Sequence, residues 1–132
     1  MLSNIGTTLV VFTLFISFFI INASFVDLKN TNKLVSKKLY KFSLLQSTFI
    51  IVAFFTLITS FVVSDFSVIN VFQNSHSTKP LFYKIVGTWG NHEGSLLLWI
   101  NILVIFSYLF LDYNKNSKKN YRLYTLVIQN LL

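Results

Sequence analysis

A short segment between residues 89 and 99 carries most of the side chains in this sequence that could take part in recognition chemistry. It reads Trp-Gly-Asn-His-Glu-Gly-Ser-Leu-Leu-Leu-Trp, and its candidate residues are Trp89, Gly90, His92, Glu93, Gly94, Ser95 and Trp99. Indole rings pack against flat apolar surfaces, while an imidazole or a carboxylate can hydrogen-bond to a partner or orient its charged groups. Glycines permit a positive φ or the close approach of a backbone or a flat ligand. The segment is therefore predicted to form a substrate-side or partner-side surface.

The same residues also have a purely structural interpretation. Asn91 is a suitable N-cap for a following helix, and Glu93 in the first turn would complement the positive end of the helix dipole. If that helix reaches back to residue 92, then His92, Ser95 and Trp99 share one stripe, because residues three and seven apart lie on one helix face. A lone histidine at a membrane surface is usually just solvated, but the stripe strengthens the case for a recognition role. Both interpretations stay open at this point.

Other reactive groups are scarce in the sequence. There is no cysteine, which excludes a disulfide framework, a thiol relay and a thiolate metal site in this chain. No catalytic residue and no set of metal ligands is predicted. His76 lies in a polar turn at 73–79 and is expected to be a solvated loop residue.

The elements that position residues 89–99 are predicted to be membrane helices. Of the 132 residues, 54% are hydrophobic and 17% aromatic, and the mean hydropathy is +0.64, too apolar for an ordinary soluble domain. Because a bilayer-crossing helix needs about 20 apolar residues, stretches 5–25 and 42–63 are predicted to span. Stretch 95–111 is shorter but gains a turn if its helix begins near Asn91, and 123–132 is predicted to be a partial fourth helix. The expected fold is an all-α integral membrane protein of one domain, with three transmembrane helices plus that partial fourth.

The basic residues predict the orientation of these helices. The predicted loops 26–41 and 112–122 hold nine lysines and arginines against two aspartates, whereas loop 64–94 holds two lysines against two acidic residues. Basic loops stay on the cytoplasmic or matrix side, so the N-terminus and loop 64–94 are predicted to face the periplasm or intermembrane space. Topology thus accounts for the net charge of +7, and no nucleic-acid partner is expected.

The outer loop 64–94 is predicted to be structured. Residues 65–72 alternate roughly between apolar and polar types, which suggests an extended segment, although Val68 and Ile69 break the alternation. Pro80 suits the first position of a helix. The apolar residues that follow fall on one helical face, and they are Leu81, Phe82, Ile85, Val86 and Trp89. This pattern predicts a short interfacial helix on the outer leaflet, with Tyr83 and Trp89 anchored at the level of the lipid headgroups.

Several of these segments resemble the N-terminal region of the CcmF family. The matching residues are Asn4 to Gly6, Val62 to Val68, Asn74 and Ser75, Pro80 to Lys84, and Thr88 to Trp99. The last of these strings is highly specific. The resemblance implies a cytochrome c-type biogenesis protein, part of a cytochrome c haem lyase. Such proteins accept haem from the haem chaperone CcmE and help attach it, through thioethers, to the two thiols of a Cys-x-x-Cys-His motif in apocytochrome c.

The resemblance also implies that this chain does not act alone. The family is several-fold longer, and its tryptophan-rich haem-handling segment and its haem-ligating histidines lie downstream of the matched region. His92 matches the family string, yet this does not make it a haem ligand. Haem is therefore expected to be handled by the complex, without catalysis by this chain in isolation. The implied partners are the remaining CcmF polypeptides, CcmE, apocytochrome c and its thiol-handling factors.

The cellular location is predicted from the start of the chain and its composition. Residues 1–25 have no basic residue and too long an apolar core for a signal peptide, so the chain is expected to insert unprocessed. Heavy use of Phe, Ile, Leu, Asn, Lys and Ser suggests an AT-rich genome, which favours a mitochondrial inner-membrane protein, with a bacterial plasma membrane as the alternative. The sequence is expected to be a split-gene product or a piece of a longer chain.

Two other functions are considered. A structural or assembly subunit of a respiratory complex is the alternative function. A small transporter is disfavoured, because only Asn22, Gln46 and scattered hydroxyls lie within the spans.

Overall fold

A computed structural model describes residues 2–29, 33–113 and 119–131, which form helices and turns without a strand. The helices are α1 (Leu2–Lys29), α2 (Lys33–Val62), α3 (Ile69–Asn74), α4 (Leu81–Gly87), α5 (His92–Tyr113) and α6 (Lys119–Leu131). Within these ranges α1, α2 and α5 are long and apolar enough to cross a membrane. The predicted all-α membrane fold is confirmed.

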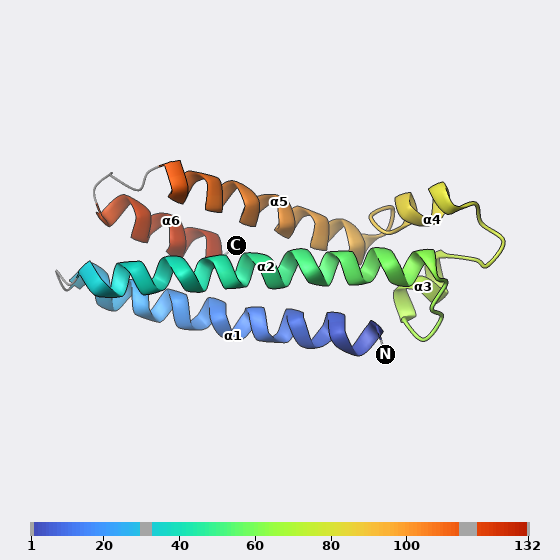
Figure 1. Cartoon of the computed structure of the whole chain (residues 1–132), viewed down its shortest axis with the longest axis horizontal. Helices are drawn as coiled ribbons and strands as arrows, with labels where there is room; N and C mark the ends of the chain where they lie inside the picture. Colours follow the sequence, from blue (N-terminus) through green and yellow to red (C-terminus); the bar gives the residue numbers. More distant parts are fainter. Residues whose placement is uncertain (1, 30–32, 114–118, 132) are drawn as a thin grey trace.

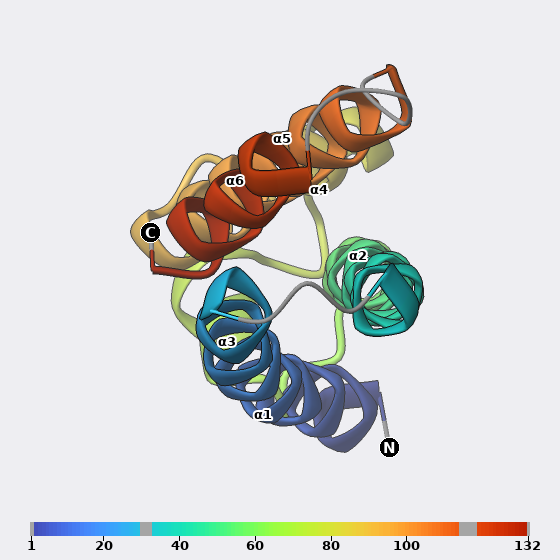
Figure 2. The ribbon, with the colours of Figure 1, turned by 90° about the vertical axis from the view of Figure 1, so that its left-hand side faces the viewer.

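The three long helices run along the bundle, and the short helices α3 and α4 lie together at one of its ends. One end, here called the loop end, carries α3, α4 and the first turn of α5 (Figure 1). At the opposite end, the hairpin end, α1 leads to α2 and α5 leads to α6. α1 and α2 form an antiparallel pair, and α5 packs on α2. α6 lies between α1 and α5 and contacts both (Figure 2). It runs only along the half of the bundle next to the hairpin end (Figure 1).

Apolar and polar contacts together hold α6 in this position. The apolar core at the hairpin end draws on α1, α2, α5 and α6, with the buried residues Ile20, Leu39, Leu111, Leu123 and Leu126. Gln46 of α2 donates through Nε2 to Asn130 Oδ1 of α6 at 2.8 Å and also to Ser17 Oγ of α1. Ser107 of α5 donates to Gln129 Oε1 of α6. Such hydrogen bonds fix helix register in a membrane, because a polar group left unpaired in hydrocarbon is costly.

The helices extend further than the apolar stretches from which they were predicted. α1 continues to Lys29 and α2 begins at Lys33, so most of the predicted loop 26–41 is helical. α5 continues to Tyr113, and α6 begins at Lys119 rather than at residue 123. No glycine or proline interrupts these segments, and lysine is a good helix former, so the helices run on past the apolar core. Hydrophobicity marks the part that crosses the bilayer and not the end of the helix.

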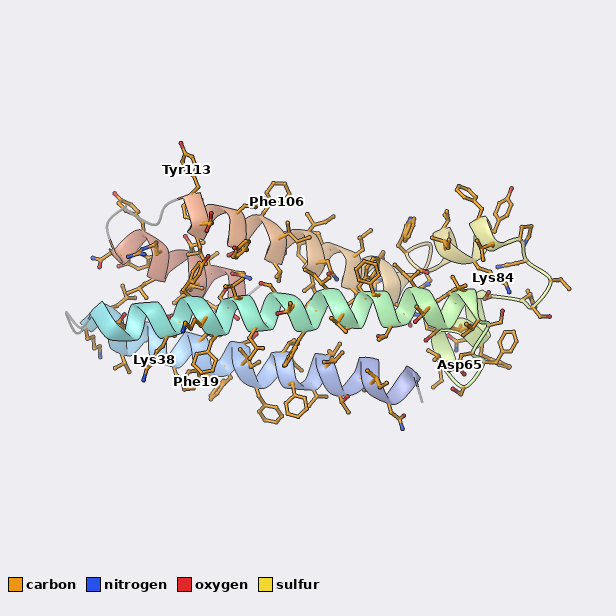
Figure 3. All side chains as sticks on the ribbon, viewed as in Figure 1. Phe19, Lys38, Asp65, Lys84, Phe106 and Tyr113 are labelled. Atoms are coloured by element: carbon orange, nitrogen blue, oxygen red, sulfur yellow. The ribbon has the colours of Figure 1, made fainter. Side chains whose placement is uncertain are left out.

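The two groups of charged residues lie at opposite ends of the bundle. Lys38 is at the hairpin end, whereas Asp65 and Lys84 are at the loop end (Figure 3). Some of the cations predicted for the inner loops have side chains outside the described residues, namely Lys33, Lys37, Lys115, Lys118 and Lys119. The separation by ends agrees with the charge pattern, while the side of the membrane that each end faces stays a prediction.

The extended segment predicted for residues 65–72 is wrong. The chain makes a turn in which Val68 N–H donates to Asp65 O at 3.1 Å, and it then forms α3 from Ile69. An isolated extended segment would leave its backbone groups without partners, whereas a turn and a helix satisfy them locally. The break in alternation at Val68 and Ile69 was the sequence signal for this helix. α3 buries Val71 completely.

The short helix predicted after Pro80 is present as α4. Pro80 was predicted as the first helical residue, but it is the N-cap, so the helix begins one residue later, at Leu81. α4 packs on α2. The predicted apolar face holds only in part, because Ile85 and Val86 are half-buried while the apolar residues of the first turn are exposed. Trp89 lies beyond the helix and is half-buried. The position of α4 on a membrane leaflet stays a prediction.

Candidate functional site at the loop end

The predicted recognition segment spans a turn and the start of a membrane helix. Trp89 and Gly90 lie in the turn after α4, and α5 begins at His92. Asn91 caps α5, because its Oδ1 accepts a hydrogen bond from the backbone N–H of Gly94 at 2.8 Å. The structural interpretation of Asn91 is therefore confirmed, and α5 does reach back far enough to place the downstream residues on a common face.

Asn91 also joins α5 to the two short helices. Its Nδ2 donates to Gly87 O at 2.9 Å and to Thr88 O at 3.3 Å, at the end of α4. From α3, Asn70 donates through Nδ2 to Asn91 Oδ1 at 3.0 Å and to Glu93 Oε2 at 3.2 Å. The side chains of these asparagines thus hold α3, α4 and α5 together. Glu93 receives one of these bonds while it occupies the first turn of α5, where the helix dipole favours a carboxylate.

Gly94 is required by close packing and not by an unusual backbone angle. A Cβ at this position would lie 1.6 Å from Thr88 O, and Thr88 itself is fully buried. Cβ atoms at Gly87 and Gly90 would meet their neighbours at ordinary contact distances of 3.6 and 3.5 Å. No glycine in the described residues has a positive φ. Of the two expectations for these glycines, close backbone approach therefore applies at Gly94, and positive φ is wrong.

The predicted stripe on α5 faces outward. His92, Ser95 and Trp99 are all exposed, and Trp99 keeps 50% of its surface accessible. Ser95 donates through Oγ to His92 O at 2.9 Å, so its hydroxyl is satisfied within its own helix. In the described part of the chain, no three His, Asp or Glu side chains gather as a metal-binding group. The stripe therefore offers an imidazole and an indole as a contact surface.

The turn after α2 supports the loop end from the other side. Ser64 has a φ of 56°, and the Asp65 N–H donates to Ser60 O at 2.9 Å. This is the Schellman motif that caps the C-terminus of a helix, in which glycine usually occupies the position of Ser64. Lys84 of α4 donates through Nζ to Ser64 Oγ at 2.6 Å. The Ser67 hydroxyl and the Ser67 backbone N–H both donate hydrogen bonds to the Asp65 carboxylate. These bonds, the hydroxyl's being the more important, hold the pKa of the Asp65 carboxyl below its usual value. Local and long-range bonds together fix this turn.

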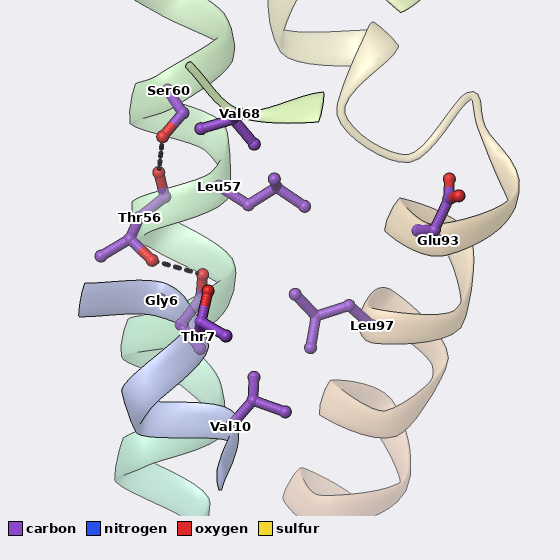
Figure 4. A pocket seen from close by; sticks show the side chains of 10 residues that line it. Gly6, Thr7, Val10, Thr56, Leu57, Ser60, Val68, Glu93 and Leu97 are labelled. Carbon is purple, nitrogen blue, oxygen red and sulfur yellow. Dashed lines mark hydrogen bonds between the residues drawn. The ribbon is translucent and has the colours of Figure 1, made fainter. Parts of the chain in front are cut away.

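A cavity of about 480 Å³ opens directly below this polar assembly. It lies between α1, α2 and α5 and is lined mainly by apolar side chains, among them Val10, Leu57 and Leu97 (Figure 4). Glu93 also lines it. The cavity thus adjoins the recognition segment through Glu93 and Leu97.

Comparison with curated proteins gives clear matches to part of the chain. CycK of Bradyrhizobium diazoefficiens, a cytochrome c-type biogenesis protein, is 48% identical over 87 residues, which is 66% of this chain. The cytochrome c-type biogenesis protein CcmF of Escherichia coli is 49% identical over 51 residues, or 39% of the chain. NrfE of the same organism, a probable cytochrome c-type biogenesis protein, is 46% identical over 67 residues, or 51% of the chain. No family model matches the sequence. No solved structure matches it either.

Over these parts the chain is homologous to cytochrome c-type biogenesis proteins named CycK, CcmF and NrfE. The resemblance inferred from the sequence is thereby confirmed. The chain spans only 13% of the length of CycK and 8% of that of the Escherichia coli CcmF. These relatives are biogenesis proteins, so they lend no support to the alternative of a respiratory-complex subunit.

Several residues that build the loop end were not predicted from the sequence. Asn70 was hidden in the segment interpreted as extended, and Thr88 carried no signal that it would be fully buried against Gly94. The bond between Lys84 and Ser64 joins residues 20 positions apart, which no local pattern reveals. The break in alternation at Val68 and Ile69, just before Asn70, was the one available hint.

Proposed function

We propose that this chain is the N-terminal subunit or fragment of a CcmF-type cytochrome c haem lyase. The observation that carries the proposal is the identity of about one residue in two with biogenesis proteins over as much as 66% of the chain. In this role the chain helps transfer haem from the haem chaperone CcmE to apocytochrome c, where thioether bonds form with the two thiols of the Cys-x-x-Cys-His motif. It is not catalytic alone, and the remaining CcmF polypeptide completes the enzyme.

The exposed stripe on α5 supports a contact role at the loop end. One imidazole at His92 and one half-exposed indole at Trp99 suit contact with a flat macrocycle or with a protein that presents it. The family resemblance implies that the ligands of the haem iron come from the partner polypeptide. The charge pattern supports placing this end on the periplasmic or intermembrane-space side, where cytochromes c mature. The bilayer is a bacterial plasma membrane or a mitochondrial inner membrane, and the curated matches named above are bacterial.

Substitutions on one helix test this role. His92→Ala and Trp99→Ala remove exposed side chains, so the chain should still insert and accumulate while covalent haem on cytochrome c falls. Phe106→Ala is the matched control, because Phe106 lies on the same helix with 68% of its surface exposed and away from the loop end. Trp99 is a cleaner test than Trp89, which is half-buried and also supports the turn. Wild-type covalent haem in both test variants would count against a direct contact role.

A further inference from the structure

The side chain of Asn70 links α3 to the first turn of α5. It is half-buried, and its Nδ2 donates to Asn91 Oδ1 at 3.0 Å and to Glu93 Oε2 at 3.2 Å. Val71 is the only buried residue of α3, so the apolar packing of this helix rests on Val71 and not on Asn70. The contribution of Asn70 is therefore made through its hydrogen bonds to α5.

The amide group of Asn70 is oriented by its own helix. Asn74 donates through Nδ2 to Asn70 O at 2.9 Å and to Asn70 Oδ1 at 3.5 Å. Lys79 in turn donates through Nζ to Asn74 O at 2.8 Å. Because the Oδ1 of Asn70 is directed at Asn74, its Nδ2 is left to donate to α5. A chain of hydrogen bonds thus runs from the polar turn after α3 to Glu93.

Glu93 carries an exposed carboxylate whose orientation depends on Asn70. A glutamate side chain has several rotatable bonds, and an exposed one keeps this freedom unless another group holds it. Asn70 holds Oε2, and within the described residues no hydrogen bond reaches Oε1. Neither Lys79 nor Lys84 neutralises the carboxylate, since both donate to uncharged oxygen atoms elsewhere. Oε1 is therefore available as an acceptor, next in the chain to the exposed His92.

We propose that Asn70 is a positioning residue for the contact surface at the loop end. It holds Glu93 so that Oε1 accepts a hydrogen bond from an N–H or O–H group of the partner that meets His92 and Trp99. This role rests on the proposed function and deepens it, because the partner must then present a flat apolar surface to the indole and a donor group to the carboxylate.

The amount of the haem chaperone CcmE needed for haem attachment tests this role, in membranes with all partner chains present. Asn70→Asp keeps the size of the side chain and the acceptor for Asn74, but its carboxylate cannot donate to Glu93. Docking must then immobilise a free glutamate side chain. The CcmE level that gives half-maximal covalent haem on cytochrome c should therefore rise by about tenfold, with an unchanged maximum.

Two further variants of α3 accompany this measurement. Asn70→Ala removes the donor without adding a charge, and it should shift the half-maximal CcmE level in the same direction. Gln73→Glu is the matched control, because it makes the same change from amide to carboxylate on an exposed residue of α3 whose side chain makes no hydrogen bond among the described residues. It should leave both the half-maximal level and the maximum unchanged, and a shift equal to that of Asn70→Asp would overturn the proposal.

Glu93→Ala decides whether Asn70 acts through the carboxylate. Asn91 keeps its capping bond to the backbone of Gly94 in this variant. If Asn70 acts through Glu93, Asn70→Asp should produce no further shift when it is added to Glu93→Ala, because residues that act as a pair are not additive. A further shift in the double variant would assign the effect to the bond with Asn91 and overturn the proposal.

The remaining outcomes separate the role of Asn70 from the proposed function. A lower maximum at an unchanged half-maximal level, in both Asn70→Asp and Asn70→Ala, would indicate a purely structural residue and overturn the proposal, as would no change in either variant. In both cases the proposed function stands if His92→Ala still lowers covalent haem. If covalent haem on cytochrome c does not depend on this chain at all, the proposed function fails, and the partner of Glu93 with it.

Discussion

Replacing Gly94 by alanine should destabilise the loop end more than any other single methyl group added there. The added Cβ would lie 1.6 Å from Thr88 O, about 1.8 Å short of ordinary van der Waals contact at 3.4 Å. The obstacle is a backbone carbonyl that also accepts a hydrogen bond from Asn91 Nδ2, so it cannot rotate away as a side chain could. Relief therefore requires the turn between α4 and α5 to move away from α5.

The magnitude follows from opposing effects. Overpacking costs about 1–3 kcal/mol, and the upper part of this range applies because backbone must move. Opening the turn also weakens the cap between Asn91 and Gly94, worth about 1 kcal/mol. Against this, alanine is favoured over glycine in a helix by about 0.5–1 kcal/mol. We therefore expect Gly94→Ala to lower the free energy of unfolding by about 2–3 kcal/mol.

Thermal unfolding in detergent, followed by circular dichroism, measures this loss. Gly90→Ala is the control, because its Cβ would meet only ordinary contacts, the nearest at 3.5 Å. Its effect should stay within about 0.5 kcal/mol of the wild type. If Gly94→Ala unfolds at the wild-type temperature or above it, the close approach of Thr88 to α5 is refuted.

The remaining predictions concern the cap, the turn after α2 and the orientation. Asn91→Ala should cost about 1–2 kcal/mol in the same assay, because it removes the cap and the bonds to α4, whereas Asn91→Asp should lose less because it keeps the capping oxygen. Ser67→Ala should raise the pKa of Asp65 toward 3.8, as followed by carbon NMR of the carboxyl, since the lost hydroxyl was the main cause of the lowered pKa. The pKa of Asp65 in the folded chain lies below 3.8, so the ionised carboxylate stabilises the turn at pH values above 3.8. This contribution to stability is lost as the pH falls through the folded pKa. The chain has no native cysteine, so Asn74→Cys should react with an impermeant thiol reagent added outside the membrane, and Lys38→Cys only after permeabilisation. Labelling of Lys38→Cys in intact membranes would contradict the predicted orientation.

The sequence by itself determined the features that depend on neighbouring residues. Apolar stretches long enough to cross a bilayer located the three long helices, because the bilayer imposes that length on each helix separately. Asn91 was recognisable as an N-cap because capping acts within one turn, and the spacing of His92, Ser95 and Trp99 placed them on one face for the same reason. The string from 88 to 99 was specific enough to indicate the family.

The tertiary structure decided the contacts between distant segments. The bond between Gln46 and Asn130 spans 84 positions, and that between Asn70 and Glu93 spans 23, so neither is implied by local periodicity. The cavity between α1, α2 and α5 is formed by residues far apart in the sequence, and the approach of Thr88 gave Gly94 its role. Helix formation depends on bonds between residues a few positions apart, whereas helix placement depends on how the surfaces of whole helices fit together, which only the folded chain defines.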